Sequence, residues 1–129
     1  MPENNLFEFE YAVVRIVPRV EREEFLNVGV VLYCAKEQFL QMQYAVNEER
    51  LHAFACDADM EEIKSYLHAF EQICTGSDTA GPIAKLPLGG RFRWLTATRS
   101  TIVQTSKVHP GLCSNAAEML AKIYKQQVL

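Results

Sequence analysis

Arg15-Ile-Val-Pro-Arg-Val-Glu-Arg-Glu-Glu-Phe-Leu-Asn-Val-Gly-Val-Val-Leu32 is the stretch that decides the fold. Upstream of it, residues 6–17 alternate in the manner of a strand whose second half is apolar on both faces. Residues 19–24 are too charged for a core and form a connector. Residues 25–35 then form a strand apolar enough to be central. Arg15 falls in the most apolar part of the first strand, so its charge requires a carboxylate, carbonyl groups or an anionic ligand.

The second strand carries two residues that strands disfavour, Asn27 and Gly29. Gly29 indicates a bulge or a close approach of another backbone, and Asn27 needs hydrogen-bond partners if it is buried. Residues 38–46 alternate as a third strand, and the short gap before them predicts an antiparallel hairpin with the second.

Helices and further strands follow in separate blocks. Asn47 is placed to cap a short helix, Asp57 or Asp59 to cap a longer one that ends at Gly76, and Ser114 or Asn115 to cap the last. Residues 77–90 form a loop, residues 92–97 and 101–107 two more strands, and residues 109–111 a turn. This order predicts a single α+β domain over residues 1–129, with a mainly antiparallel sheet of about five strands and helices packed on one face.

The composition is that of an ordinary globular chain of 129 residues, with 49% hydrophobic and 22% charged residues. No apolar run approaches the ~18 residues that cross a bilayer. The first residues, Met-Pro-Glu-Asn-Asn, lack the basic and apolar regions of a signal peptide, so we expect no membrane association and a cytoplasmic protein. The four cysteines form no Cys-x-x-Cys pair, which favours small buried side chains in a reducing compartment.

The net charge of −3 conceals an uneven distribution. Residues 21–78 hold 12 acids and 4 bases, a net charge of −8, whereas residues 79–117 hold 5 bases and no acid. Such a division can mark an anion-facing surface, or it can mean that the two halves pair with each other.

Polar residues near the predicted strands are the main candidates for a binding site. Arginine forks bind carboxylates and phosphates in a bidentate manner, so several of them with an amide and a hydroxyl could hold a small anionic ligand. The alternative is an internal network in which Glu24 neutralises Arg15 and Asn27 ties down the connector. The ligand-binding candidates are Arg15, Glu24, Asn27, Arg91, Arg99, Ser100 and His109.

Three other chemistries receive weaker support. The Arg91–Trp94 stretch interleaves bases and aromatics, but its alternation is that of a half-buried strand, which argues against nucleic acid. His52 with Cys56 and His109 with Cys113 have the same spacing and could make a zinc site, although both cysteines also fit the core. Ser100 or Ser106 with His109 lacks a nucleophile motif, as does Cys113 beside His109. We therefore predict no catalytic residue, no metal and no cofactor.

Four motifs run through the chain: Arg15-x-Val-Pro18, Glu24-Phe-x-Asn-Val-Gly-Val-x-Leu32, Arg91-Phe-x-Trp-Leu-Thr-Ala-x-Arg-Ser100 and His109-x-Gly-x-Cys113. With them the chain resembles, over about residues 9–124, a family of small bacterial proteins catalogued as domain of unknown function 3037. The resemblance implies no activity. It does imply a genomic neighbourhood, because relatives are often encoded beside kinases similar to HipA.

These observations favour a non-enzymatic binding or regulatory module with a protein partner, which the resemblance suggests is a HipA-like kinase. The alternative is a small enzyme or a nucleic-acid-binding factor that uses the Arg/Asn/Ser group, and a homo-oligomer stays open. Arginines that converge on an open cleft would support a ligand. A flat, exposed apolar patch would support a partner.

Overall fold

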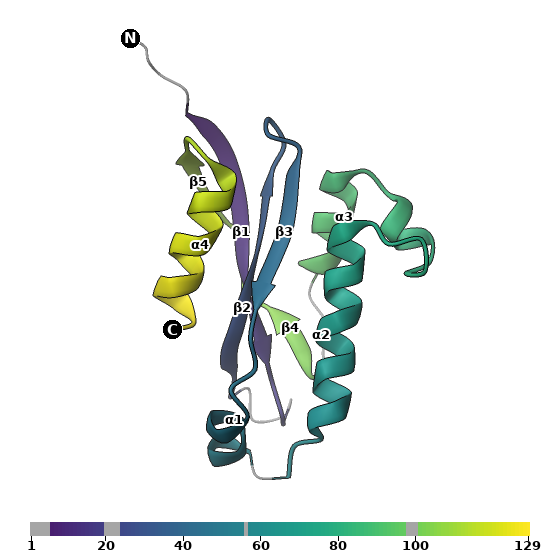
Figure 1. Cartoon of the computed structure of the whole chain (residues 1–129), viewed down its shortest axis with the longest axis vertical. Helices are drawn as coiled ribbons and strands as arrows, with labels where there is room; N and C mark the ends of the chain where they lie inside the picture. The colour runs from purple at the N-terminus through teal and green to yellow at the C-terminus, as the bar shows by residue number, and fades with distance from the viewer. Residues whose placement is uncertain (1–5, 20–23, 56, 98–100) are drawn as a thin grey trace.

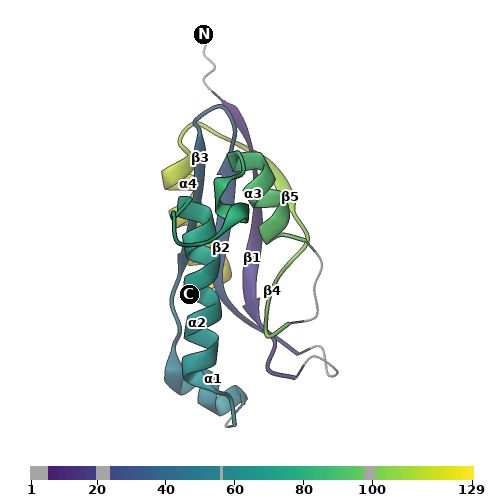
Figure 2. The same ribbon diagram turned by 90° about the vertical axis from the view of Figure 1, so that its right-hand side faces the viewer.

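The centre of the fold is an antiparallel sheet, seen in a computed structural model that describes residues 6–19, 24–55, 57–97 and 101–129. Its strands are β1 (Phe7–Ile16), β2 (Leu26–Cys34), β3 (Phe39–Tyr44), β4 (Val103–Thr105) and β5 (His109–Cys113). The order is β3-β2-β1-β4, and β5 also pairs with β1, further along the same edge as β4. Figure 2 shows β3 at one side of the sheet and β4 and β5 at the other. The predicted α+β class and five-stranded antiparallel sheet are confirmed.

The β1–β2 pair contains the bulge that Gly29 indicated. Val14 pairs with Gly29, but the next residue, Arg15, pairs with Asn27, so the register shifts by one residue at this point. A Cβ atom on Gly29 would lie 2.6 Å from the Cβ of Tyr44, closer than any real contact. Glycine is therefore required here because β3 approaches β2 so closely, as the sequence predicted.

The helices are α1 (Glu48–Phe54), α2 (Met60–Thr75), α3 (Leu88–Leu95) and α4 (Ala116–Gln127), with a short 3-10 helix, η2 (Pro82–Lys85), between α2 and α3. The helices α1, α2 and α4 begin at side-chain caps expected from the sequence. Asn47, Asp59 and Asn115 each accept a hydrogen bond from the backbone N–H three residues on. Gly76 ends α2 in the left-handed conformation, with φ of 73°.

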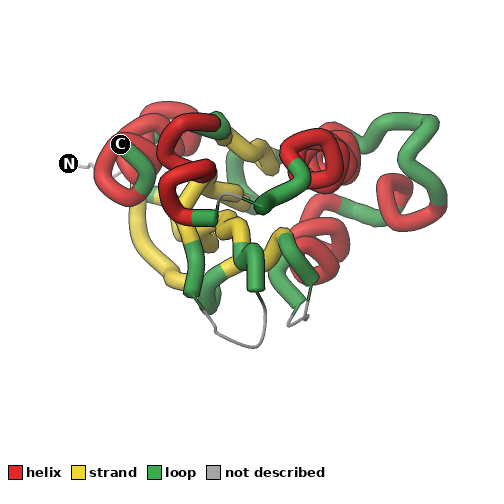
Figure 3. The backbone as a smooth tube through the Cα atoms, turned by 90° about the horizontal axis from the view of Figure 1, so that it is seen from below, coloured by secondary structure: helices red, strands yellow, loops and turns green. Residues whose placement is uncertain are grey.

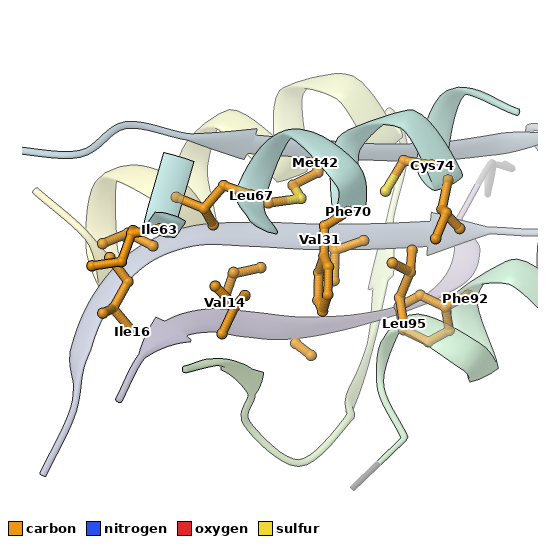
Figure 4. Packing of buried hydrophobic residues seen from close by; sticks show 14 of the residues in the cluster. Val14, Ile16, Val31, Met42, Ile63, Leu67, Phe70, Cys74, Phe92 and Leu95 are labelled. Carbon is orange, nitrogen blue, oxygen red and sulfur yellow. The ribbon is translucent and has the colours of Figure 1, made fainter. Parts of the chain in front are cut away.

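The sheet carries a hydrophobic core on each face, which corrects the prediction that all helices pack on one face. Ile63, Leu67 and Phe70 of α2 and Phe92 of α3 pack with Val31 on one side (Figure 4). Leu120 and Ile123 of α4 belong to a second cluster, with Val30 and Leu32. Because Val30 and Val31 are neighbours in a strand, they point to opposite faces. Figures 1 and 3 show α4 on one side of the sheet and α2 and α3 on the other. The prediction was wrong because the apolar residues on the two faces of β2 were not interpreted as evidence for a helical layer on each face of the sheet.

Two further corrections concern the region after residue 87. Residues 92–97, predicted as a strand, lie mainly in helix α3, because Leu88, Phe92 and Leu95 recur at helical spacing and face the core. The predicted strand 101–107 is only the three-residue β4.

The predicted turn at residues 109–111 belongs to strand β5. Pro110 is tolerated in a strand at this position because β5 is an edge strand. A turn-forming sequence is thus held extended by its pairing with β1, which local patterns do not reveal.

Candidate functional site

Arg15 lies at the bulge, between Asn27 of β2 and Gln104 of β4. Its guanidinium carbon stacks 3.9 Å from the centre of the Phe25 ring, which is 45% exposed. The Nε atom is buried and has no hydrogen-bond partner within the described part of the chain. Burial lowers the pKa of the Arg15 guanidinium from its ordinary value. Thus the contact found for Arg15 among the described residues is an aromatic ring, whereas the sequence led us to expect a carboxylate, carbonyl groups or an anionic ligand.

Asn27 links β2 to the end of α4. Its Nδ2 donates to the backbone oxygen of Gln127 at 3.2 Å, and its Oδ1 is buried with no partner among the described residues. Arg50 of α1 donates to the neighbouring oxygen of Val128 at 3.5 Å. Both donors meet carbonyls at the C-terminal end of a helix, where positive or donor groups are favourable. Asn27 therefore has a structural role, although it anchors α4 and not the connector.

Glu24 lies elsewhere, at an exposed position just before β2. It lines a hollow of about 210 Å³ together with Arg19, His52 and Phe54. Arg15 is not among the residues that line this hollow. The pairing of Glu24 with Arg15 that the sequence suggested is absent from the ion pairs of the described residues.

The two arginines of α3 are both engaged on the opposite side of the sheet from Arg15. Arg91 Nη1 donates to the backbone oxygens of Ile73 and Cys74, at 3.3 and 3.1 Å, and so caps the C-terminal end of α2. Arg93 forms a bidentate pair with Glu10 at 2.7 and 3.1 Å, and this bond raises the pKa of Arg93. Neither guanidinium faces Arg15, because α3 packs on the other core.

The remaining candidates do not complete a site. His109 stands across from Tyr11, with 5.2 Å between the ring centres, beside the middle of β1 and four residues along the strand from Arg15. Arg99 and Ser100 lie outside the described residues. The described candidates therefore occupy separate places on the molecule and do not converge on one anion.

Ser106, considered as a nucleophile with His109, has a structural role between β4 and β5. Its hydroxyl accepts from the N–H of Val13 at 2.8 Å and donates to the oxygen of Lys107 at 2.9 Å. Its own N–H donates to the oxygen of Val13 at 2.8 Å. Ser106 thus continues the ladder of β1 across the gap between the two short strands.

The cysteines and histidines assemble no reactive or metal-binding group in the part of the chain that the structure describes. No cluster of three or more His, Cys, Asp or Glu residues suits a metal ion there, and Cys56 lies outside that part. Burial raises the pKa of the Cys74 thiol to about 12, so this thiol is protonated and unreactive at neutral pH. None of the helices in the described residues is long and apolar enough to cross a bilayer.

An apolar surface that the sequence did not reveal lies on the α3 side of β1 and β5, next to α3, whose Phe92 stacks on Tyr33 at its border. We call it the open sheet face. Leu112 is 58% exposed and Leu6 is 53% exposed. Two adjoining hollows, of about 650 and 370 Å³, share Glu8 and Ala35 in their linings. The residues that define the open sheet face are Leu6, Glu8, Tyr33, Ala35, Pro110 and Leu112.

Pairing explains why these side chains share a face. Glu8 is opposite Leu112 and Glu10 is opposite both Pro110 and Tyr33, so they all point to the side on which Ala12 meets α2 and α3. The sequence did not predict this shared face, because residues 109–111 were interpreted as a turn and Leu112 was therefore not assigned to either face of a strand. A leucine two residues after a proline, within the motif from His109 to Cys113, was the available signal.

The comparisons with known proteins give one match. The model of the family described as "Protein of unknown function (DUF3037)" matches residues 11–128. Neither the curated proteins nor the solved structures contain a match to the chain.

Proposed function

The chain belongs to the DUF3037 family, and on this premise we propose that it works by binding a protein partner through the open sheet face. The family description carries no activity, so the proposal rests on the geometry of the chain itself. The observation that supports it is an exposed apolar surface on a sheet that helices otherwise cover on both faces.

Uncovered apolar side chains on a sheet face are unusual on a monomer and mark interaction sites. Here Leu6, just before β1, and Leu112 of β5 lie beside hollows that a partner's side chains would fill. The arginine candidates that the structure describes do not converge on one cleft, because Arg91 caps α2 and Arg15 stacks on Phe25 on the other side of the sheet. This distribution favours a protein partner over a small anionic ligand.

Charge indicates the chemistry of the partner surface. Glu8 is exposed and lines both hollows, whereas Lys36 lines only the smaller one, and Glu10 borders the face in its pair with Arg93. Acidic groups repel phosphates and carboxylates, and they attract lysine and arginine. We infer a partner surface with apolar side chains at its centre and a basic residue opposite Glu8. A HipA-like kinase, which the family resemblance suggests, is the first candidate for this partner.

Leu112→Glu tests the proposal. The exposed position tolerates a charge, so folding is retained, while a charge in the centre of the interface weakens binding by at least about tenfold. The measurement is titration calorimetry of the purified protein with a HipA-like kinase from the same host. Leu129→Glu introduces the same charge at another exposed leucine and serves as the matched control.

Equal loss of binding in both variants would contradict the proposal, as would unchanged binding in Leu112→Glu. If the kinase does not bind wild-type protein at all, this partner is wrong. The open sheet face is then tested with whichever protein co-purifies stoichiometrically from the host. Retention of that protein by Leu112→Glu would overturn the interface itself.

A further inference from the structure

The two edges of the sheet differ in the hydrogen-bonding groups that they present. Ala45 donates its N–H to Val28, so by the alternation of an antiparallel ladder the β3 residues 39, 41 and 43 bond to β2. The N–H and C=O groups of Leu40, Met42 and Tyr44 therefore point away from β2. Within the described chain they have no backbone partner.

The same counting shows that the opposite edge is protected. The N–H and C=O groups of Val13 both bond to Ser106, so the backbone groups of the odd-numbered β1 residues point toward β4 and β5. The backbone groups of Pro110 and Leu112 in β5 therefore point away from β1, toward the open edge. Proline has no N–H, so of these two only Leu112 can donate to an added strand. Proline and short strands are common means of blocking an edge.

The β3 edge has none of these protections. It is a six-residue strand, Phe39–Tyr44, without a proline, a bulge or a charged residue. In Figure 1 β3 lies toward the viewer, with α4 on one side and α2 on the other. A single added strand needs about 4.8 Å beside β3 and can lie between these helices. A second copy would bring its own α2 to the same edge, where helices need about 8–10 Å between axes.

A groove of about 430 Å³ runs along the α2 side of this edge, and its lining includes Leu40, Glu71, Thr75 and Arg91. Alternate side chains of an added strand would enter it. Glu71 is already engaged, because it accepts from the Tyr44 hydroxyl at 3.2 Å and lies 3.9 Å from His68. Arg91 contacts only backbone oxygens, and its buried Nε has no partner among the described residues.

We propose that the outer edge of β3 is a strand-addition site for an extended segment of a partner protein, with an acidic side chain that pairs with Arg91. The backbone groups of Leu40, Met42 and Tyr44 supply the affinity, and the groove beside Arg91 supplies the selectivity. This site is separate from the open sheet face and does not depend on it.

Synthetic peptides of about eight residues, a usual strand length, serve as probes. They alternate threonine and valine, and a glutamate is placed in turn at each interior position. The expected result is that the best glutamate peptide shifts the amide NMR signals of Leu40, Met42 and Tyr44 and slows their hydrogen exchange. Its lysine counterpart binds at least about tenfold more weakly, because it would face Arg91. Arg91→Gln removes this preference.

Backbone pairing is tested separately from side-chain contact. Peptides that are N-methylated along one edge lose the donors on that edge only. We expect methylation of one edge to abolish binding and methylation of the other edge to leave it unchanged. The Leu112→Glu variant should bind the glutamate peptide as wild type does, which separates this site from the proposed function.

Several results would overturn the inference. They are the absence of any shift at the three amides, equal binding of the glutamate and lysine peptides, and equal binding of the two methylated isomers. If the three amides become protected with protein concentration alone, the occupant is a second copy and the proposed peptide partner is wrong.

Discussion

Arg15 is a charged residue whose side chain is half-buried. Its guanidinium stacks on Phe25, and its buried Nε has no partner within the described residues. Such a group is stabilising only if its packing outweighs the loss of hydration. Its role is then that of a long side chain covering an aromatic ring, which a neutral side chain of similar length can also fill.

The first prediction concerns Arg15→Met. We expect the free energy of unfolding to stay within about 1 kcal/mol of wild type, because methionine keeps the packing and removes a poorly satisfied charge. Urea denaturation measures this, and Arg15→Ala, which loses the contact with Phe25, should be the less stable variant. A loss of about 3 kcal/mol or more in Arg15→Met would mean that an anion holds the guanidinium.

For single residues, the sequence predicted those roles that depend on the residue's own chemistry and its place in a strand. Gly29 was identified because strands reject glycine unless a backbone comes close, and Asn27 because a buried amide needs partners. The surroundings of Arg15 and Arg91 could not be predicted in the same way. Their contacts join residues distant in the chain, such as Arg91 with Ile73 and Cys74, and depend on how α2 and α3 pack.

The end of α2 depends on one side chain from a different element. Arg91 of α3 donates to two carbonyls in the last turn of α2, and a Cβ atom on Gly76 would lie 2.5 Å from the Arg91 Nη1 atom. Glycine and arginine thus complete the cap together. Arg93, two residues on, forms a more exposed ion pair with Glu10.

The second prediction compares these two arginines. Arg91→Ala should lower the free energy of unfolding by about 1–3 kcal/mol, because charged hydrogen bonds to half-buried carbonyls are lost. Arg93→Ala should cost at most about 1 kcal/mol, since exposed ion pairs contribute little. Urea titration gives both values, and amide exchange in the last turn of α2 should accelerate only in Arg91→Ala. The reverse order of the two losses would contradict this account of the cap.

The helix α3 and strand β5 are two elements whose secondary structure the local sequence pattern does not predict. Phe92 and Trp94 alternate as in a strand, but Leu88, Phe92 and Leu95 also recur as in a helix, and a short segment satisfies both periods. His109-Pro-Gly111 has turn-forming residues, yet β1 holds it as a strand. Caps, by contrast, were predictable, because Asn47, Asp59 and Asn115 act within three residues of their own position.

The part of the chain that the structure describes forms one sheet between two hydrophobic layers. Leu67 of α2 is fully buried on one face and Leu120 of α4 is buried on the other, and both layers use residues of β2. Since neighbouring residues of the same strand support opposite layers, neither layer can lose its packing while the other is kept.

The third prediction follows from this shared strand. Leu67→Ala and Leu120→Ala should each lower stability by about 2–5 kcal/mol, and each should shift a single unfolding transition. The test is urea unfolding followed by circular dichroism and by the fluorescence of Trp94, which lies near Phe70 on the α2 side. If Leu120→Ala separated the two signals into different transitions, the layers would be independent.

The contrast between the β3 and β5 edges also bears on how copies of this protein can aggregate. A filament grows by edge-to-edge pairing only if each molecule can pair through both edges of its sheet, one with the molecule before it and one with the molecule after it. Here the second edge is poorly receptive, because Pro110 leaves Leu112 as the one outward donor of these two β5 residues and β4 is only three residues long. The chain can therefore expose the β3 edge with a reduced hazard of polymerising into filaments.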